Sequence, residues 1–443
     1  MLFAVPDRGH RRAAADKHQE ACRPSPLRSF VAALPVALLF VAGALVAAGV
    51  GSSPAAAAPA DGAHAGAAPA PQAKWTVMVY MCGDNSLEPW LPRQIDRQLA
   101  AVGSNADVQV VALADRGRHP SGADGAWTGA RLFHVTRGMT GTSENAVADW
   151  GNANMGSPQT LVNFVTWTRA NYPADHYALF LWDHGWGWWP HETMKDVTSN
   201  DTLDMEEIRS AMQAVAGVDM VGMDTCLGQM IEVEAQFRGF ADAVAGTQDS
   251  TGYSGFYYPQ ILSRLQAEPA MSAARLATVA AQSMKSRHDR WTLASSAVAL
   301  NVRWDALTSA VSDLAWDLQS RLLKHRRAYA LARRHAEIPC QVPYQEVRDL
   351  YDAAYELKMH VASPLIRKDC TKVMWLIRRV VLYEWSTKAE GDLHGISIFW
   401  PAAPAPPHKG SSFSQWVNFP YYCAQLMFTR LTYWGDFLIS WGG

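Results

Sequence analysis

The sequence predicts an α/β fold in which helices flank a mostly parallel sheet, followed by a largely helical C-terminal addition. Between residues 74 and 254, apolar runs of strand length alternate with segments of helical spacing. This alternation is typical of βαβ units and of a sheet covered on both faces. After residue 254 the helical segments become longer. The chain has 443 residues, of which 49% are hydrophobic, enough for such a core and an addition.

Each predicted strand is a short apolar run that ends at a polar or glycine-containing turn. In the core these runs cover residues 75–81, 108–114, 177–182, 218–223 and 241–246. Two later runs, at 291–300 and 395–400, are predicted to be further strands that the C-terminal half contributes to the same fold.

Helices are predicted where apolar residues recur with a period near 3.6. The segment 157–172 begins at Ser157-Pro158, a favourable helix start. The segment 204–215 opens with Asp204-x-x-Glu207, the pattern of a capping box. The remaining predicted helices cover residues 230–240, 273–285, 304–327 and 364–384.

The N-terminal part differs from the predicted fold. Residues 1–51 join a basic leader to an apolar stretch, and residues 52–73 form a linker rich in Ala, Pro and Gly. The apolar stretch is long for a cleaved signal peptide and close to the length of a membrane span. Both a cleaved signal and a single-span tether fit, so we expect an exported protein, either secreted or in the cell envelope. Residues 74–254 are the predicted core, and residues 255–443 an extension packed on it.

The formal net charge of −2 and the absence of a basic block argue against nucleic acid as a partner. The sequence lacks the CxxC and HExxH patterns, so no metal site is predicted. In an exported protein, four of the six cysteines are candidates for disulfides, and their spacing does not select a pairing. These are Cys82, Cys340, Cys370 and Cys423.

Two predicted strands end at residues capable of nucleophilic chemistry. His184 and Gly185 follow the run 177–182, and Cys226 follows the run 218–223. Adjacent parallel strands would bring both side chains to one edge of the sheet, where open α/β folds place their sites. A histidine can activate a cysteine, so the pair is predicted to be a catalytic dyad. Each residue alone is more often structural.

The surroundings of this pair add three expectations. Cys226 precedes a predicted helix, whose N-terminus would lower the thiol pKa and whose amides could bind an oxyanion. Gly185 offers an unhindered amide. Asp224 is either a turn residue or a carboxylate that binds Arg or Lys in a specificity pocket. The three tryptophans between positions 186 and 189 fit a core cluster and a lid equally well.

The chain resembles the clostripain-like cysteine peptidases, of the clan that includes caspases, legumains and gingipains. The motifs that carry the resemblance are residues 75–81 with 84–88, Leu181-Trp-Asp-His-Gly185, and Gly222-Met-Asp-Thr-Cys-Leu227 with Glu232. Weaker similarity extends to residue 401. The resemblance implies a caspase-like three-layer sandwich and an endopeptidase that acts on proteins or peptides.

The resemblance also implies roles for individual residues. His184 would be the acid/base and Cys226 the nucleophile, the amides of Gly185 and Cys226 would hold the oxyanion, and Asp224 would select Arg or Lys before the cut. Self-activation by cleavage is expected after Lys195, in a segment predicted to be a flexible loop. No cofactor is expected.

Some members of the family depend on calcium. Asp196, Asp201 and Asp204 are too few to place a calcium site here. Family members usually have acidic residues after the strand that ends near Ala245, whereas this chain departs from the pattern with Gly246-Thr-Gln-Asp-Ser.

Two other functions fit the same sequence. The altered segment and the possible anchor are compatible with a catalytically silent, surface-tethered binding protein on a peptidase scaffold. A cysteine transpeptidase would share the acyl-enzyme and differ in the acceptor.

Overall fold

The computed structural model describes residues 72–117, 127–191, 193–253, 255–286, 292–339, 346–387, 391–402 and 418–442. The predicted leader and nearly all of the linker lie outside this part of the chain. Among the described helices, none combines the length and the apolar character needed to cross a membrane.

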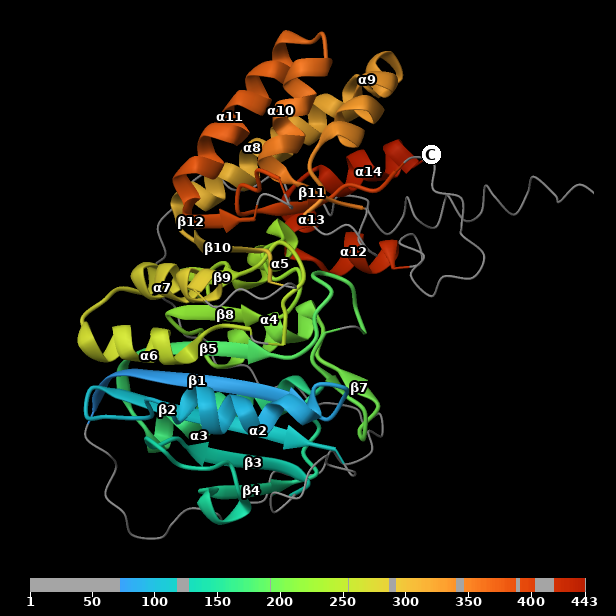
Figure 1. Cartoon of the computed structure of the whole chain (residues 1–443). Helices are drawn as coiled ribbons and strands as arrows, with labels where there is room; N and C mark the ends of the chain where they lie inside the picture. Colours follow the sequence, from blue (N-terminus) through green and yellow to red (C-terminus); the bar gives the residue numbers. More distant parts are fainter. Residues whose placement is uncertain are drawn as a thin grey trace, which may run out of the picture.

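A mixed sheet forms the centre of the molecule, and in the described residues it has nine strands in the order β12-β10-β9-β8-β5-β1-β2-β3-β4 (Figure 1). Its five central strands are parallel and correspond to the five predicted core strands. They are β2 (Val108–Arg116), β1 (Ala73–Gly83), β5 (Ala174–Trp182), β8 (Met220–Asp224) and β9 (Ala243–Gly246).

Antiparallel strands extend the sheet at both ends. On the β2 side these are β3 (Gly129–His134) and β4 (Ala148–Gly151). On the β9 side they are β10 (Ala294–Ala299) and β12 (Val381–Ser386). The open edges of the parallel core are therefore covered by paired strands, which protects the exposed backbone groups of its outer members.

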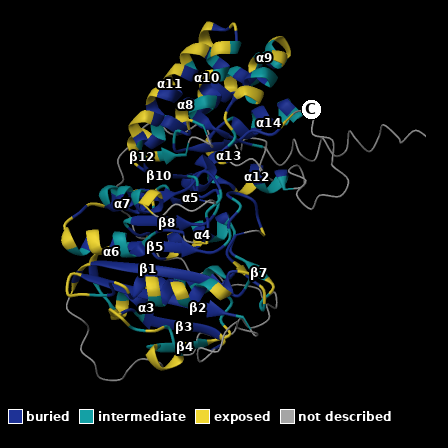
Figure 2. Ribbon diagram, in the orientation of Figure 1, coloured by how far each residue is buried: buried dark blue, intermediate teal, exposed yellow. Residues whose placement is uncertain are grey.

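Helices cover both faces of the sheet, which explains why the central strands are apolar throughout. Met78 and Tyr80 of β1 pack into one hydrophobic core, and Val77 and Val79 pack into the other. Figure 2 shows the central strands buried and the outward faces of the helices exposed.

The first core is closed by α3 (Pro158–Asn171), α4 (Met205–Ala214) and α5 (Ile231–Phe237). The second is closed by α2 (Leu91–Arg93), the π-helix η3 (Gln94–Leu99), α6 (Tyr258–Ala267) and α7 (Ala273–Ser286). The predicted capping box is present: the Asp204 carboxylate accepts from the Glu207 amide, and the Glu207 carboxylate accepts from the Asp204 amide.

The C-terminal extension stands beyond the β12 edge of the sheet (Figure 1). Its main helices are α8 (Val302–Ser320), α9 (Leu322–His335), α10 (Leu350–His360) and α11 (Pro364–Val380). It also contains α12 (Phe419–Gln425), α13 (Met427–Leu431), α14 (Trp434–Gly442), and a small sheet of β11 (Val347–Asp349) and β13 (Ser397–Phe399).

Three predictions in the extension are wrong in detail. The helix predicted over 304–327 is two helices, because the backbone leaves the helical region at Arg321 (φ −115°, ψ 12°). The helix predicted over 364–384 ends at Val380, and the following residues form β12, paired with β10. The run 395–400 provides β13, which pairs with β11 rather than with the main sheet.

Buried carboxylates of α5 join the core to the extension. Oε1 of Glu232 accepts from the Phe399 amide at 2.9 Å and from the Tyr422 hydroxyl at 2.8 Å. Oε2 of Glu234 accepts from Nε1 of Trp304 at 2.8 Å. Burial raises the pKa of Glu232 to about 7 and that of Glu234 to about 8. The extension is thus fixed to the same short helix that follows Cys226 in the chain.

Candidate active site

His184 and Cys226 line one cavity of about 230 Å³. The parallel register of β5 and β8 brings them together, because the last residues of the two strands, Trp182 and Asp224, are paired and each candidate residue lies two positions beyond its strand. The rest of the wall comes from four chain segments. Its residues are Leu87, Trp182, Asp183, Asp224, Ser250, Thr251, Gly252 and Tyr253.

His184 is held by groups that follow the ends of β1 and β5. Its Nε2 lies 2.8 Å from Oγ of Ser86, and its amide donates to the neighbouring Asp183 carboxylate at 2.6 Å. Burial, and then the positive charge of Lys195, lower the pKa of the imidazole. The neutral ring is therefore favoured, as a general base requires.

The Asp183 carboxylate, in the cavity wall, joins three segments of the chain. Its Oδ1 accepts from Nδ2 of Asn85 at 2.8 Å, and its Oδ2 accepts from the Lys195 amide at 2.6 Å. Burial raises the pKa of this carboxyl to about 8. Asp183 therefore fixes the backbone around His184.

The Cys226 sulfur accepts a hydrogen bond from the Thr251 amide at 3.2 Å. Burial raises the thiol pKa above its ordinary value, although the Thr251 amide acts in the opposite direction. The prediction that a helix N-terminus lowers this pKa is wrong, because the next helix, α5, begins only at Ile231. The free protein therefore favours the thiol.

Gly185 occupies a position where a side chain would not fit. A Cβ atom there would lie 2.6 Å from Cβ of Thr225 and 3.1 Å from the carbonyl oxygen of Cys226. The backbone at Gly185 thus packs directly against the loop that carries the cysteine, a close approach that glycine allows. The two amides assigned to the oxyanion belong to adjoining stretches of backbone.

The Asp224 carboxylate is buried and also contributes to the cavity wall. Its Oδ1 accepts from the Phe256 amide at 3.1 Å, and its Oδ2 accepts from the Tyr258 hydroxyl at 2.9 Å. Burial raises its pKa to about 7. A cationic side chain entering the cavity would favour the charged form of this carboxyl.

The tryptophan cluster next to His184 belongs mainly to the core. Trp188 and Trp189 are buried and stack on each other, and both contact Phe399 edge-on. Neither residue contributes to the cavity wall. The wall does include Ser250, the last residue of the altered segment 246–250, and Tyr253, whose ring stacks on that of Trp90 with the two centroids 4.7 Å apart.

Lys195 does not lie in the flexible loop that was predicted. It is part of β6 (Lys195–Asp196), which pairs with β7 (Asp201–Thr202). Its side chain is exposed, but its carbonyl oxygen accepts from Nδ2 of Asn85 at 2.9 Å and from the Cys82 thiol at 3.1 Å. The peptide bond after Lys195 is therefore anchored.

Asp196, Asp201 and Asp204, the acidic residues weighed for a calcium site, have separate structural partners. The Asp201 carboxylate accepts from Asn154, and Asp204 caps α4. Asp196 instead gathers with Asp84 and Asp115, with carboxylate oxygens within 4.8 Å of one another. Burial, followed by the charges of Asp196 and Asp84, raises the pKa of Asp115 to about 8.

Among the cysteines, Cys82 and Cys370 are free thiols and Cys423 is disulfide-bonded. Cys340 lies outside the described residues. Of the four candidates for disulfides, Cys82 and Cys370 therefore do not form one. Both pack into a hydrophobic core, and the Cys82 thiol also donates to the Lys195 carbonyl.

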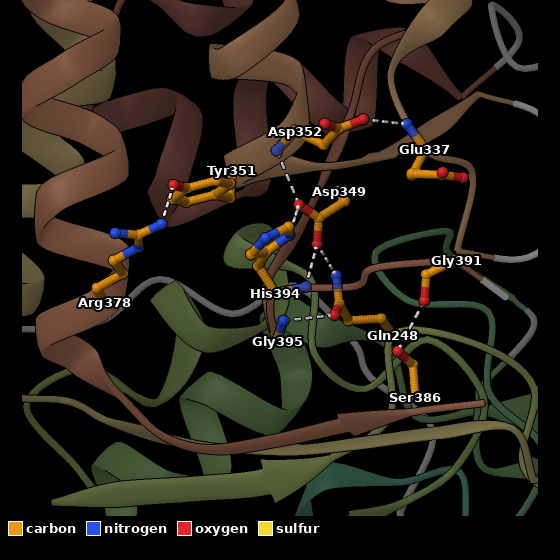
Figure 3. A network of polar contacts seen from close by, with 10 residues as sticks. All are labelled: Gln248, Glu337, Asp349, Tyr351, Asp352, Arg378, Ser386, Gly391, His394 and Gly395. Carbon is orange, nitrogen blue, oxygen red and sulfur yellow. Dashed lines mark hydrogen bonds and ion pairs between the residues drawn. The ribbon is translucent and has the colours of Figure 1, made fainter. Parts of the chain in front are cut away.

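A polar network in the extension supports the loop after β9 (Figure 3). Oδ2 of the fully buried Asp349 accepts from Nε2 of Gln248 at 3.0 Å and from the His394 amide at 2.7 Å. Oε1 of Gln248 accepts from the Gly395 amide at 2.6 Å. Gln248 lies three residues before Thr251, so the extension helps to position the backbone that contacts the Cys226 sulfur.

Sequence reasoning assigned no role to Ser86 or Thr251, although both touch the candidate dyad. Each follows the end of a parallel strand, β1 and β9 respectively. That position was a usable signal, since residues beyond the carboxyl ends of parallel strands line the sites of α/β folds. Their residue types gave no further indication.

The fold and site together define an α/β protein with a thiol and an imidazole in one pocket at the carboxyl edge of its sheet. A model of the clostripain family matches residues 79–441. The chain therefore belongs to the clostripain family of cysteine peptidases. Clostripain of Hathewaya histolytica is 27% identical over 223 residues, which cover 44% of this chain and 42% of that relative. The match spans less than half of that relative's length.

Two solved structures share the fold. An inactive zymogen C11 protease from Parabacteroides distasonis aligns with a TM-score of 0.60 at 19% identity, covering 82% of this chain and 99% of that one. A secreted C11 cysteine protease from Bacteroides thetaiotaomicron, bound to an irreversible peptide inhibitor, aligns with a TM-score of 0.57 at 17% identity, covering 80% and 99%. The fold is thus caspase-like.

Proposed function

We propose that this protein is an exported endopeptidase that cuts peptide bonds after Arg or Lys, with Cys226 as nucleophile and His184 as acid/base. The observation that carries the proposal is the single cavity lined by His184, Cys226 and the buried carboxylate of Asp224. Membership of a cysteine peptidase family supports the same reaction.

In the proposed reaction, the Cys226 thiol gives its proton to His184 as the sulfur attacks the scissile carbonyl carbon. The amides of Gly185 and Cys226 hold the oxyanion. The His184 imidazolium then protonates the leaving amine, the C–N bond breaks, and a thioester to Cys226 remains. His184 then takes a proton from a water that attacks the thioester carbonyl. The C–S bond breaks, the new carboxyl end of the substrate leaves, and the proton on His184 returns to the Cys226 sulfur. These steps require no cofactor.

Asp224 supports the preference for basic residues because it is an acidic group in the cavity wall beside the nucleophile. A bound guanidinium or ammonium would form a charge-assisted hydrogen bond with it. The Phe256 amide and the Tyr258 hydroxyl offset part of the cost of burying that carboxylate.

The test uses fluorogenic peptides that differ only at the residue before the cut. We expect turnover after Arg and Lys, loss of turnover in Cys226→Ala, and normal turnover in the matched thiol variant Cys370→Ala.

Asp224→Asn should lower kcat/KM for Arg and Lys peptides by about 100-fold, as expected when a buried charge pair is lost. An active Cys226→Ala variant would refute the assignment. Transfer of the acyl group to an added amine would indicate a transpeptidase.

Export and self-activation extend the proposal. The basic and apolar leader supports export, as do the disulfide-bonded Cys423 and the fold shared with a secreted protease.

We propose that the chain is cut after Lys195, which requires local opening of β6 and β7 because the Lys195 carbonyl is hydrogen-bonded. Mass spectrometry should show the cut in the wild type but not in Lys195→Ala. Full peptidase activity of an uncut Lys195→Ala chain would exclude an activating role.

A further inference from the structure

Three side chains of metal-binding type meet on the surface of the helical extension, and none of them has a part in the proposed peptidase reaction. His335 is the last residue of α9, and Glu356 and His360 lie one turn apart on α10. Oε2 of Glu356 lies 3.0 Å from Nε2 of His360 and 3.6 Å from Nδ1 of His335. The two imidazole nitrogens are 3.2 Å apart.

These separations fit a tetrahedral metal ion. Zinc bonds to nitrogen and oxygen ligands are about 2.0–2.2 Å long, so the edge between two ligand atoms of a tetrahedron is about 3.3–3.6 Å. The three edges here are 3.0, 3.2 and 3.6 Å, so sub-ångström shifts would place one ion within bonding distance of all three atoms. The rings of His335 and His360 are inclined at 76°, so their nitrogen atoms converge without stacking.

The donor set selects the kind of ion. Two imidazoles and one carboxylate are ligands that zinc and neighbouring transition metals accept, whereas Ca²⁺ and Mg²⁺ prefer oxygen atoms alone. His335 is about half exposed, with a side-chain accessibility of 48%, so an ion and a water ligand can reach the site. Glu356 and His360 are partly buried, at 17% and 27%, which limits their movement.

We propose that His335, Glu356 and His360 bind one divalent transition-metal ion, with Zn²⁺ as the reference ion and water as the fourth ligand. The ion would cross-link the end of α9 to α10, two helices separated in the chain by β11. Because an ion that binds only the folded state stabilises it by mass action, zinc should raise the thermal stability of the protein.

The binding test uses the full chain carrying Cys226→Ala, because the candidate nucleophile could itself bind zinc. Competition with a fluorescent chelator should show one more zinc equivalent than in the same chain with His335→Ala and His360→Ala. Glu356→Gln alone should weaken that equivalent by at least about tenfold, the smallest loss typical even for residues that support metal ligands. His325→Ala, on the same helix α9, is the matched control and should bind zinc unchanged.

Thermal unfolding provides an independent readout. Zinc should raise the unfolding midpoint of the parent chain, which carries only Cys226→Ala, and of the same chain with His325→Ala added. This rise should be lost when His335→Ala and His360→Ala are added instead. The proposal would be overturned if the parent chain and the chain with His335→Ala and His360→Ala bound zinc with equal stoichiometry and affinity. An equal rise with Ca²⁺ would overturn the transition-metal assignment. Both readouts measure binding, so they are independent of the peptidase proposal.

Discussion

The protonation state of Cys226 follows from its burial. Burial raises its pKa, and burial also lowers the pKa of His184, so the free protein favours a neutral thiol beside a neutral imidazole. We therefore expect no preformed thiolate–imidazolium pair. Proton transfer would accompany the attack on the substrate, when both groups are close to the carbonyl.

This state predicts the pH dependence of Cys226 alkylation. Because the thiolate is the reactive form, its reaction with iodoacetamide should accelerate steadily from pH 6 to above pH 8.5, the ordinary thiol pKa. Mass spectrometry of the Cys226 peptide measures the rate, and Cys370→Ala controls for labelling elsewhere. A rate that is already maximal near pH 6 would demonstrate a thiolate pair and contradict the prediction.

At the residue scale, the sequence was sufficient to place His184 and Cys226 at one edge of the sheet, because both follow apolar runs of parallel strands. It could not predict the direction of the thiol pKa shift. That shift depends on how completely the loop around Thr251 covers the sulfur, and on α5 starting five residues after Cys226. Both are results of tertiary packing.

The loop after β9 depends on an element from the extension. Gln248 donates to Asp349 and accepts from the Gly395 amide, and Asp349 also accepts from the amide of Asp352 at 2.9 Å as the N-cap of α10 (Figure 3). The loop that touches Cys226 is thus attached to the first turn of α10. The position of α10 therefore limits how far the loop after β9 can move.

Removal of this attachment should weaken the peptidase. Gln248→Ala leaves the buried Gly395 amide without its acceptor, a cost of about 1–3 kcal/mol. It also removes one of the two donors to Oδ2 of Asp349 and loosens the wall that carries Thr251. We expect kcat/KM to fall about tenfold and the Cys226 alkylation profile to shift. Gln319→Ala removes a comparable amide bonded to Ser440, far from the loop in sequence, and is the control. Equal effects of the two variants would contradict a positioning role for Gln248.

At the element scale, the predicted strands of the core are confirmed because both faces of the sheet are buried and each strand is apolar throughout. The break at Arg321 carries no Gly or Pro signal, so the sequence indicated one helix instead of two. The end of α11 was missed because helical spacing continues past Val380, whereas pairing with β10 extends the chain from Val381 onward. Edge pairing overrides local preference there.

Across the whole molecule, the carboxyls buried between core and extension link stability to pH. The pKa of Glu234 is about 8 in the folded protein, against about 4.3 in an unfolded chain. Between these values the folded state binds the proton more tightly. The stability that Glu234 contributes is therefore complete below about pH 4 and is lost as the pH rises through about 8.

Replacement of Glu234 by Gln should flatten this dependence. The amide oxygen can still accept from Trp304 and does not titrate, so the fall in unfolding free energy between pH 5 and 8 should become shallower by up to about 1.4 kcal/mol per pH unit. Urea unfolding at several pH values, in chains that also carry Cys226→Ala to prevent self-digestion, measures the slope. The exposed carboxylate variant Glu268→Gln is the control. If Glu234→Gln keeps the same slope of unfolding free energy against pH as the Cys226→Ala parent and Glu268→Gln, then Glu234 is not the group responsible for this pH dependence.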